Sequence, residues 1–410
     1  MTDPVSLLVQ TREIDDPGDL MGLLPADAPV AWVRGHDGIV GWGSIAESSP
    51  SGSARFATAE QWWDDLTSRA IVRDTVGLPG TGLIAFGSFP FSGDSDTGRL
   101  VVPEVVVGRR DGTAWVTTIG VRADLSPALA QHDPIPLPPT TLIDEESARS
   151  TWKAAVAEAV AHIRDGELDK VVLARAVDAQ FAQPLDVRTV LRSLADGYPT
   201  CWTFHLDGFF GATPELLVRL ERGLVTSRVL AGTIRRTGDD SRDLALAGSL
   251  ARSSKDLEEH EYAVRSVANA LASHCTSMNV PESPFVLHLP NVMHLATDVT
   301  GVLRDGASAI SLAAALHPSA AVGGTPTEAA VAMIGQIEGL DRGRYAGPVG
   351  WVSASGDGEW GIGLRSAQLS SDRRSARVFA GCGIVADSDP EAELAEADAK
   401  LQPVLTALAH

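Results

Sequence analysis

The sequence has few cysteines, a deficit of basic residues and no long apolar run, and each shortage excludes a class of protein. Cys201, Cys275 and Cys382 lie far apart and form no Cys-x-x-Cys pair, which argues against a disulfide framework or a zinc ribbon. Lysine and arginine number 33 against 53 aspartates and glutamates, which gives a net charge of −20. We therefore expect no nucleic-acid partner, because phosphate binding requires a basic face. A small anionic substrate is still compatible, since a few local cations suffice to bind it.

No stretch of about 18 apolar residues occurs, so no membrane-spanning helix is expected. The first residues, MTDPVSLLVQTREIDD, lack the basic and apolar regions of a signal peptide. The chain instead has ordinary globular composition, with 44% hydrophobic and 21% charged residues among its 410. We expect a soluble, cytoplasmic protein, and the absence of a long heptad repeat favours a monomer.

Apolar and turn patterns divide the chain near residue 140. Residues 1–140 are rich in β-branched and aromatic runs separated by tight turns, as in RLVVPEVVVGRRDGTAWVTTI. The proline-rich HDPIPLPPTTL marks a boundary, and from 145 to 408 helical and strand-like segments alternate without a strict βαβ order. We predict an α+β fold with large antiparallel sheets.

Two local predictions can be compared directly with the structure. The apolar spacing of SARSTWKAAVAEAVAHIRDGEL predicts a helix that stops at Gly166. The segment HLPNVMHLATDVTGVL is expected to form one strand that carries both His288 and His294. We interpret these two histidines as core or single-contact residues rather than a zinc site, because no third ligand follows nearby.

A helix with an acidic start is predicted after the Asp-Ser-Asp-Pro sequence at 387–390. Ser388 or Asp389 can cap it, and acidic residues in a first turn offset the helix dipole. At about 100° per residue, however, Glu393, Glu396 and Lys400 fall within roughly 60° of one another beside the apolar face. A solvated helix start and a metal site are therefore both open at this point.

A second acidic helix start occurs in SSKDLEEHEYAV, where Asp256 and Glu259 are three residues apart. Dipole compensation explains this pair equally well. Two carboxylate pairs on separate helices could instead converge on Mg²⁺ and leave coordination positions open for a substrate carboxylate.

Three further residues could take part in catalysis or substrate binding. Lys170 begins the strand-like KVVLARAV, where it either pairs with a neighbour or, if desolvated, acts as a general base. Glu215 follows a Thr-Pro turn and is either a surface residue or a proton donor. Arg365 lies on a presumed inner strand and needs a carboxylate partner from the protein or from a ligand.

In combination, these stretches resemble the chorismate-utilising enzymes, which include isochorismate synthase, salicylate synthase and the large subunits of anthranilate and aminodeoxychorismate synthases. The resemblance covers residues 145 to 402 approximately, and the first 140 match loosely, as expected for the variable part of this fold. The implied fold has large antiparallel sheets flanked by helices around a central active-site cleft. The motifs that carry the resemblance are, in order, DKVVLAR, FGATPELL, LAGTIRR, SKDLEEHEYAV, MHLATDV, LHPSAAVGGTP, RYAGPVGW, GIGLR, AGCGIV and SDPEAELAEADAK.

The resemblance implies Mg²⁺ as cofactor and chorismate as substrate. Glu259 and Glu396 would ligate the metal, with Asp256 and Glu393 supporting them, and the metal would hold the ring carboxylate. The remaining implied substrate contacts are Gly232 and Thr233 near the same carboxylate, His294 against the ring, and Tyr345, Arg365, Gly381, Gly383 and Lys400 around the enolpyruvyl carboxylate.

Within this family, Lys170 and Ala321 indicate the reaction type. Members that use ammonia have a non-basic residue in place of the lysine, so no glutamine amidotransferase subunit is expected. A lysine implies activation of water for attack at C2, with Glu215 protonating the departing C4 hydroxyl, which converts chorismate to isochorismate. Salicylate synthases share the lysine but tend to have threonine where this chain has Ala321. Isochorismate synthase is therefore the prediction, with salicylate synthase and a non-catalytic metal-binding protein as alternatives.

Overall fold

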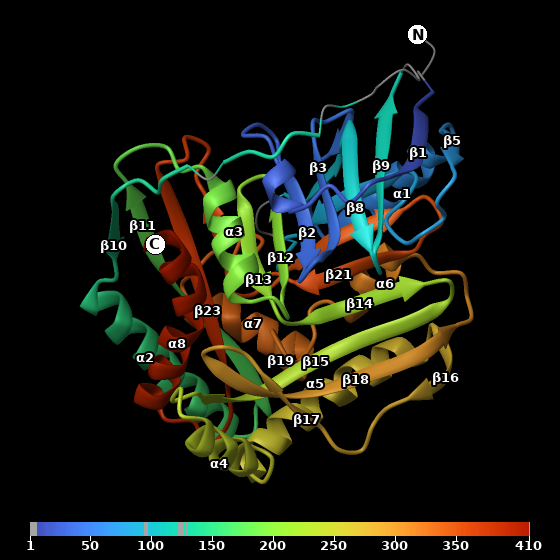
Figure 1. Cartoon of the computed structure of the whole chain (residues 1–410). Helices are drawn as coiled ribbons and strands as arrows, with labels where there is room; N and C mark the ends of the chain where they lie inside the picture. The colour runs from blue at the N-terminus through green and yellow to red at the C-terminus, as the bar shows by residue number, and fades with distance from the viewer. Residues whose placement is uncertain (1–5, 94–96, 122–126, 128, 134, 410) are drawn as a thin grey trace.

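Two large sheets, antiparallel apart from one strand pair, form the centre of the computed structural model, which describes residues 6–93, 97–121, 127, 129–133 and 135–409 (Figure 1). Among these residues the first sheet has 13 strands, and β1 pairs with β5 in parallel. Its order is β10 (Thr140–Ile143), β11 (Lys170–Phe181), β23 (Ser375–Ile384), β22 (Ser366–Leu369), β13 (Phe209–Thr213), β12 (Trp202–Leu206), β2 (Val30–Arg34), β3 (Asp37–Trp42), β8 (Val105–Arg110), β9 (Thr113–Gly120), β1 (Leu8–Ile14) and β5 (Ile71–Asp74), with β19 (Gly324–Thr325) beside β11.

The second sheet has 10 strands within the same described residues. Its order is β16 (Cys275–Asn279), β18 (Val292–Leu303), β15 (Leu224–Arg235), β14 (Leu216–Glu221), β21 (Gly358–Ile362), β20 (Pro348–Ser353), β6 (Ile84–Ser88), β7 (Arg99–Val102) and β4 (Ala46–Ser48), with β17 (Phe285–His288) beside β18. The predicted α+β class with large antiparallel sheets is confirmed.

Helices pack on both sheets near the strands that surround the candidate site, β15 and β18 in the second sheet and β23 in the first. Helix α5 packs on β15 and β18, while α8 packs on β23 and lies beside α2 (Figure 1). The described helices are η1 (Met21–Leu23), α1 (Arg55–Thr67), α2 (Glu146–Arg164), α3 (Val187–Gly197), α4 (Asp240–Leu250), α5 (Ser254–Ala272), α6 (Ala309–Leu316), α7 (Thr327–Ile337) and α8 (Pro390–Ala409). None of these helices is both long and apolar enough to cross a membrane.

The predicted helix before Gly166 is confirmed as α2, and its apolar face is the one that the spacing indicated. Gly166 follows the helix with a φ of +81°, a conformation that glycine adopts without strain. The buried residues of α2 are Trp152, Ala155, Val156, Ala159, Val160 and Ile163.

The prediction of one strand for residues 288–303 is wrong. A turn at 289–291 separates β17 from β18, and the Leu289 N–H donates to the Val292 carbonyl at 2.9 Å. His288 therefore lies on β17, and His294 on the antiparallel β18. The apolar run continues through the turn because Leu289 is itself buried, so the pattern alone did not reveal the reversal.

Strands from both sides of the proline-rich segment contribute to both sheets. In the first sheet β2 pairs with β12, and in the second β6 pairs with β20. The division into 1–140 and 145–408 stays a prediction about variability, whereas the sheets themselves are continuous across it.

Candidate active site

A cavity of about 60 Å³ lies between β11 and β23 of the first sheet and β15 and β18 of the second, with α5 and α8 closing it. Most of the residues proposed from sequence meet there. Those that line the cavity are Glu215, Gly232, Thr233, Glu259, His294, Ala321, Tyr345, Arg365, Gly381, Gly383 and Lys400. Lys170, Asp256, Glu393 and Glu396 lie outside this lining. Lys170 contacts Glu259 and Glu396 contacts Lys400, both of which line the cavity.

Lys170 begins β11 and has no exposed surface. Its Nζ lies 3.1 Å from Oε1 of Glu259 on α5. Burial raises the pKa of the Glu259 carboxyl, but Lys170, Lys400 and Lys255 outweigh that effect and hold it below its usual value. An ionised carboxylate of the cavity lining is therefore in direct contact with a water-excluded lysine that lies outside the lining.

Glu215 occupies the link between β13 and β14 and is 4% exposed. Its backbone is fixed, because its N–H donates to Thr213 Oγ1 at 3.3 Å and its carbonyl accepts from the Ile362 N–H at 3.2 Å. Burial raises the pKa of the carboxyl to about 8, against the lowering effects of the Leu230 backbone and Lys170. At neutral pH this side chain is mostly protonated and can donate a proton.

The acidic start of α8 is capped and also turned toward the cavity. Asp389 is the cap, since its Oδ1 accepts from the Ala392 N–H at 2.9 Å. Ser388 instead donates to Glu393 Oε1 at 2.7 Å, and Lys255 of α5 donates to the same oxygen at 3.0 Å. Glu396 Oε1 lies 2.6 Å from Lys400 Nζ. The predicted capping of this helix is therefore confirmed, whereas the metal site stays a prediction.

The carboxylates of α5 and α8 form an acidic cluster around Cys382. One ligand atom each from Cys382, Glu393 and Glu396 lies within 4.8 Å of the others. Burial, reinforced by neighbouring carboxylates, raises the pKa values of Asp256 and Glu393. Burial is the larger cause of both shifts and carboxylate repulsion adds to it; a bound cation would favour the ionised forms, and carboxylate oxygens are the ligands that Mg²⁺ prefers. The residues present therefore fit a divalent cation.

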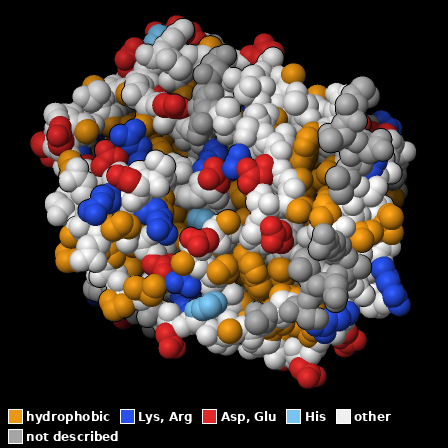
Figure 2. Space-filling model, turned by 90° about the horizontal axis from the view of Figure 1, so that it is seen from above, with side chains coloured by type: hydrophobic (Ala, Val, Ile, Leu, Met, Phe, Trp, Pro, Cys, Tyr) orange, Lys and Arg blue, Asp and Glu red, His pale blue; other side chains and the backbone are white. Residues whose placement is uncertain are grey.

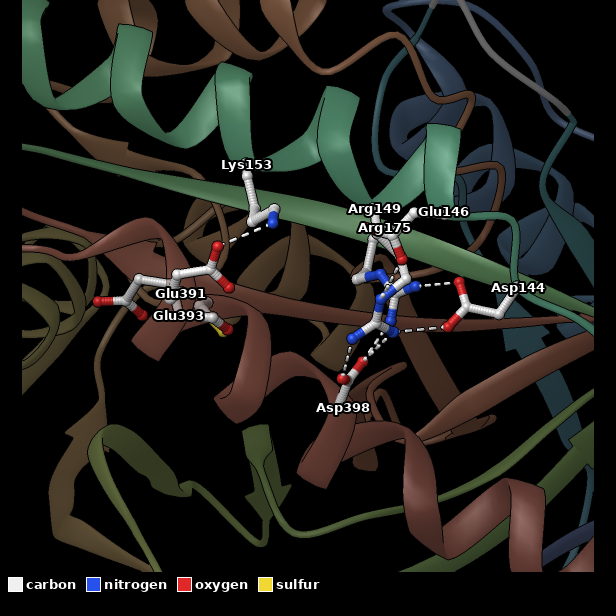
Figure 3. Close-up of polar contacts among 9 residues, drawn as sticks. Asp144, Glu146, Arg149, Lys153, Arg175, Glu391, Glu393 and Asp398 are labelled. Atoms are coloured by element: carbon white, nitrogen blue, oxygen red, sulfur yellow. Dashed lines mark hydrogen bonds and ion pairs between the residues drawn. The ribbon is translucent and has the colours of Figure 1, made fainter.

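Helix α8 is held in place from its opposite side by a network of four ion pairs. Arg149 of α2 and Arg175 of β11 both contact Asp144 and Asp398, and Figure 3 shows the four charges alternating between these elements. Asp398 lies between Glu396 and Lys400 in the sequence, and its side chain points toward Arg149 and Arg175 (Figure 3). These ion pairs hold α8 in the rotation at which Lys400, two residues beyond Asp398, lines the cavity.

His294 and Arg365 form a buried polar pair on the opposite wall. Arg365 Nη2 donates to His294 Nε2 at 2.9 Å, and the other ring nitrogen lies 3.1 Å from Thr233 Oγ1. Burial holds the pKa of His294 well below its usual value, so the ring is neutral and its proton lies on Nδ1, toward Thr233. Arg365 Nη1 is buried without a hydrogen-bond partner, which leaves a donor for a ligand carboxylate.

Aromatic and small residues shape the remaining walls. Tyr345 stacks on Phe379 with ring centroids 5.1 Å apart, and burial raises the pKa of its hydroxyl to about 12, which keeps it protonated. Gly232 has a φ of +75° at a bulge in β15, where the register with β18 shifts. A β-carbon there would lie 3.0 Å from Asp256 Cβ, so glycine permits α5 to approach.

Gly383 lies on β23, where the strand backbone approaches Glu259 and Lys170 closely. A β-carbon at this position would lie 2.2 Å from Glu259 Oε1 and 2.9 Å from Lys170 Cε. We expect Gly383→Ala to displace both side chains and reduce kcat by about 100-fold, the usual cost of a 1 Å misplacement. Steady-state kinetics with circular dichroism measure this. Gly197→Ala, at the end of α3 where the φ is not positive and a β-carbon meets nothing within 4 Å, controls for general effects of the substitution.

Sequence reasoning missed several polar residues of the site. Lys255 precedes Asp256 in the motif, but its partner Glu393 is on another helix, so no local signal revealed the pair. Arg342 lines the cavity and pairs with Glu338, and neither was proposed.

On the face drawn in Figure 2, acidic and basic side chains are interspersed.

The fold and the cavity define an enzyme site for a small anionic molecule, with an acid, a buried lysine and a cation-compatible carboxylate cluster. The chain belongs to the chorismate binding enzyme family, whose model matches residues 32–409. A Mycobacterium tuberculosis protein provisionally named isochorismate synthase MenF is 40% identical over 341 residues, covering 80% of this chain and 87% of that protein. Isochorismate synthase DhbC of Bacillus subtilis is 36% identical over 341 residues, covering 79% and 80% respectively.

Solved structures agree with this assignment. The menaquinone-specific isochorismate synthase MenF of Escherichia coli superposes with a TM-score of 0.80 at 25% identity, covering 99% of this chain and 95% of that one. Anthranilate synthase component I of Streptococcus pneumoniae, at 23% identity and a TM-score of 0.73 over 91% and 92% of the two chains, shares the fold. The predicted chorismate-utilising family and fold are therefore confirmed, whereas the roles of individual residues stay predictions.

Proposed function

We propose that this protein is a Mg²⁺-dependent isochorismate synthase that converts chorismate to isochorismate. The observation that carries the proposal is that one cavity is lined by protonated Glu215, by Arg365 and by Glu259, whose carboxylate contacts the buried Lys170. The isochorismate synthases among its relatives support it.

The chemistry requires a base and an acid at different ring carbons. Lys170 would take a proton from water as its oxygen bonds to C2, the ring double bond would shift, and the C4–O bond would break. Glu215 would donate the proton with which that hydroxyl leaves as water. One water enters and one leaves, so the reaction is an isomerisation.

Substrate orientation would come from groups at the two ends of the cavity. Arg365 Nη1 offers a free donor to the enolpyruvyl carboxylate, beside the Tyr345 hydroxyl and the backbone at Gly381 and Gly383. Glu259 and Glu396, supported by Asp256 and Glu393, would hold Mg²⁺. The metal, when bound, supplies positive charge to the ring carboxylate. His294 and Thr233 complete the wall on that side.

The deciding experiment is product analysis. Purified protein is incubated with chorismate and Mg²⁺, without ammonium salts, and the products are separated by chromatography. Isochorismate alone is the expected result. Salicylate with pyruvate would show a lyase and would mean that Ala321 is no marker of the synthase reaction. If no chorismate is consumed, with or without ammonia, the proposal is wrong and a non-catalytic metal-binding role is favoured.

The metal assignment can be tested with a matched pair of variants on α8. We expect Glu396→Gln to weaken Mg²⁺ binding, measured by calorimetry, by more than the roughly 10–100-fold typical of an outer-shell change. Glu391→Gln is the control, because Glu391 pairs with Lys153 of α2 at 2.8 Å, away from the acidic cluster (Figure 3). Chelation of the metal should abolish turnover in the wild type. Equal Mg²⁺ affinity in the two variants would contradict the assignment.

A further inference from the structure

An ion pair outside the groups assigned to chemistry is almost completely buried. Glu338 and Arg342, at and just beyond the end of α7, have side chains that are 1% and 3% exposed. Arg342 Nε donates to Glu338 Oε1 at 2.7 Å, and Nη2 donates to Oε2 at 2.6 Å. Desolvation makes such a pair a poor source of net stability, so its geometry is the feature to explain.

The same two side chains hydrogen-bond to the backbone of two other segments. Arg342 Nη2 donates to the Val172 carbonyl at 2.7 Å and Nη1 to the Val322 carbonyl at 3.0 Å. Glu338 Oε2 accepts from the Ala174 N–H at 2.7 Å. The pair therefore joins the end of α7, strand β11 and the loop before β19.

Those segments carry Lys170, the proposed base, and Ala321, which lines the cavity. Val172 is two residues beyond Lys170 on β11, and Val322 is next to Ala321 in the loop. The Tyr345 N–H also donates to the Arg342 carbonyl at 2.9 Å. On its outer side the guanidinium lies 4.2 Å from the centroid of the Phe91 ring, which closes that side with an aromatic face.

We propose that Arg342, oriented by Glu338, is a positioning residue that fixes Lys170 and the Ala321 loop relative to each other; this inference rests on the proposed function. Of the five guanidinium N–H groups, four donate to Glu338, Val172 and Val322. Although Arg342 lines the cavity, its donors are thus directed to the protein rather than to a substrate. Arg342 therefore affects the reaction indirectly, through strand β11 and the Ala321 loop, which it joins.

Arg342→Lys separates charge from geometry. Lysine keeps the positive charge beside Glu338, but an ammonium cannot reach three acceptors in the plane of a guanidinium fork. We expect kcat to fall about 10- to 100-fold, because small displacements of reacting groups have effects of this size, with KM for chorismate within about threefold of wild type. Hydrogen exchange by mass spectrometry should show faster exchange in peptides covering 170–175 and 319–324.

A matched control exists on the same strands. Arg377 of β23 pairs with Asp178 of β11 at 2.9 Å, with side chains 49% and 45% exposed. Arg377→Lys should leave kcat and the exchange of both peptides unchanged. If Arg342→Lys does not yield folded protein, Glu338→Gln replaces it, because it keeps the side-chain shape while removing the charge that orients the guanidinium.

The outcomes separate this inference from the proposed function. A wild-type protein that makes no isochorismate overturns the proposed function, and the exchange experiment still tests the joining of β11 to the loop. Unchanged kcat and unchanged exchange in Arg342→Lys would overturn the positioning role. Faster exchange spread evenly over the chain would overturn it as well, since that result describes general destabilisation.

Discussion

Lys170→Ala is expected to abolish conversion of chorismate, with kcat falling at least about 10³-fold, within the range attributed to a positioned general base. Alanine has no group to take the proton from water, and no other described lysine is in direct contact with Glu259. KM should change little, because the substrate carboxylates are held elsewhere in the proposed site. Steady-state kinetics of the variant and of wild type measure both constants.

The variant should stay folded. Removing Lys170 leaves Glu259 near Lys400 and Lys255, which still favour its ionised form. It also removes a cation that lies 3.1 Å from the Glu259 carboxylate, so Mg²⁺ should bind at least as tightly as in wild type. A circular dichroism spectrum and a Mg²⁺ titration check this. Lys153→Ala, on the outer side of α2, is the control. A collapsed spectrum, or full activity, would contradict the catalytic role.

Glu215→Gln is expected to reduce kcat by about 10²- to 10⁴-fold, the range of general acid catalysis. The amide keeps the shape of the side chain but has no acidic proton for the departing hydroxyl. Wild-type kcat/KM should fall as the pH rises through about 8, where the buried carboxyl loses its proton. That alkaline decline should be absent from the residual activity of the variant. A variant that keeps the decline would assign it to another group.

At pH 8 the Glu215→Gln variant should lose activity but not stability, which separates the effect on catalysis from an effect on folding. The pKa of Glu215 is raised from its usual 4.5 to about 8, so its favourable contribution is fully present below 4.5 and is lost as the pH rises to about 8. Glutamine has no charge to bury, so the variant should be at least as stable as wild type at pH 8. Denaturant unfolding at pH 5 and pH 8 measures the difference.

The local features of the fold could be predicted because their causes lie within a few residues. The apolar face of α2 follows from the 3.6-residue period, and its end follows from Gly166. The start of α8 follows from the capping residue Asp389 before Pro390. The prediction failed at residues 289–291, where a turn reverses the chain inside an apolar run.

The candidate site was predictable as a set of residues but not as an arrangement. The motifs named Lys170, Glu215 and both carboxylate pairs, and the family assignment that they supported is confirmed. Nothing in the local sequence placed Lys170 against Glu259, or Lys255 against Glu393. The metal and the catalytic roles await the variants described above.

The sequence alone determined the family, the α+β class and the residues capable of acid, base and metal chemistry, because those depend on residue type and short-range spacing. Only the tertiary structure decided which of them are charged and what they contact. Glu215 stays mostly protonated at neutral pH because strands distant in sequence enclose it, and His294 is neutral for the same reason. The Glu338–Arg342 pair can join α7 to β11 and to the Ala321 loop only because the folded chain brings these three segments together. Burial and convergence arise from long-range packing, and local sequence patterns carry no record of them.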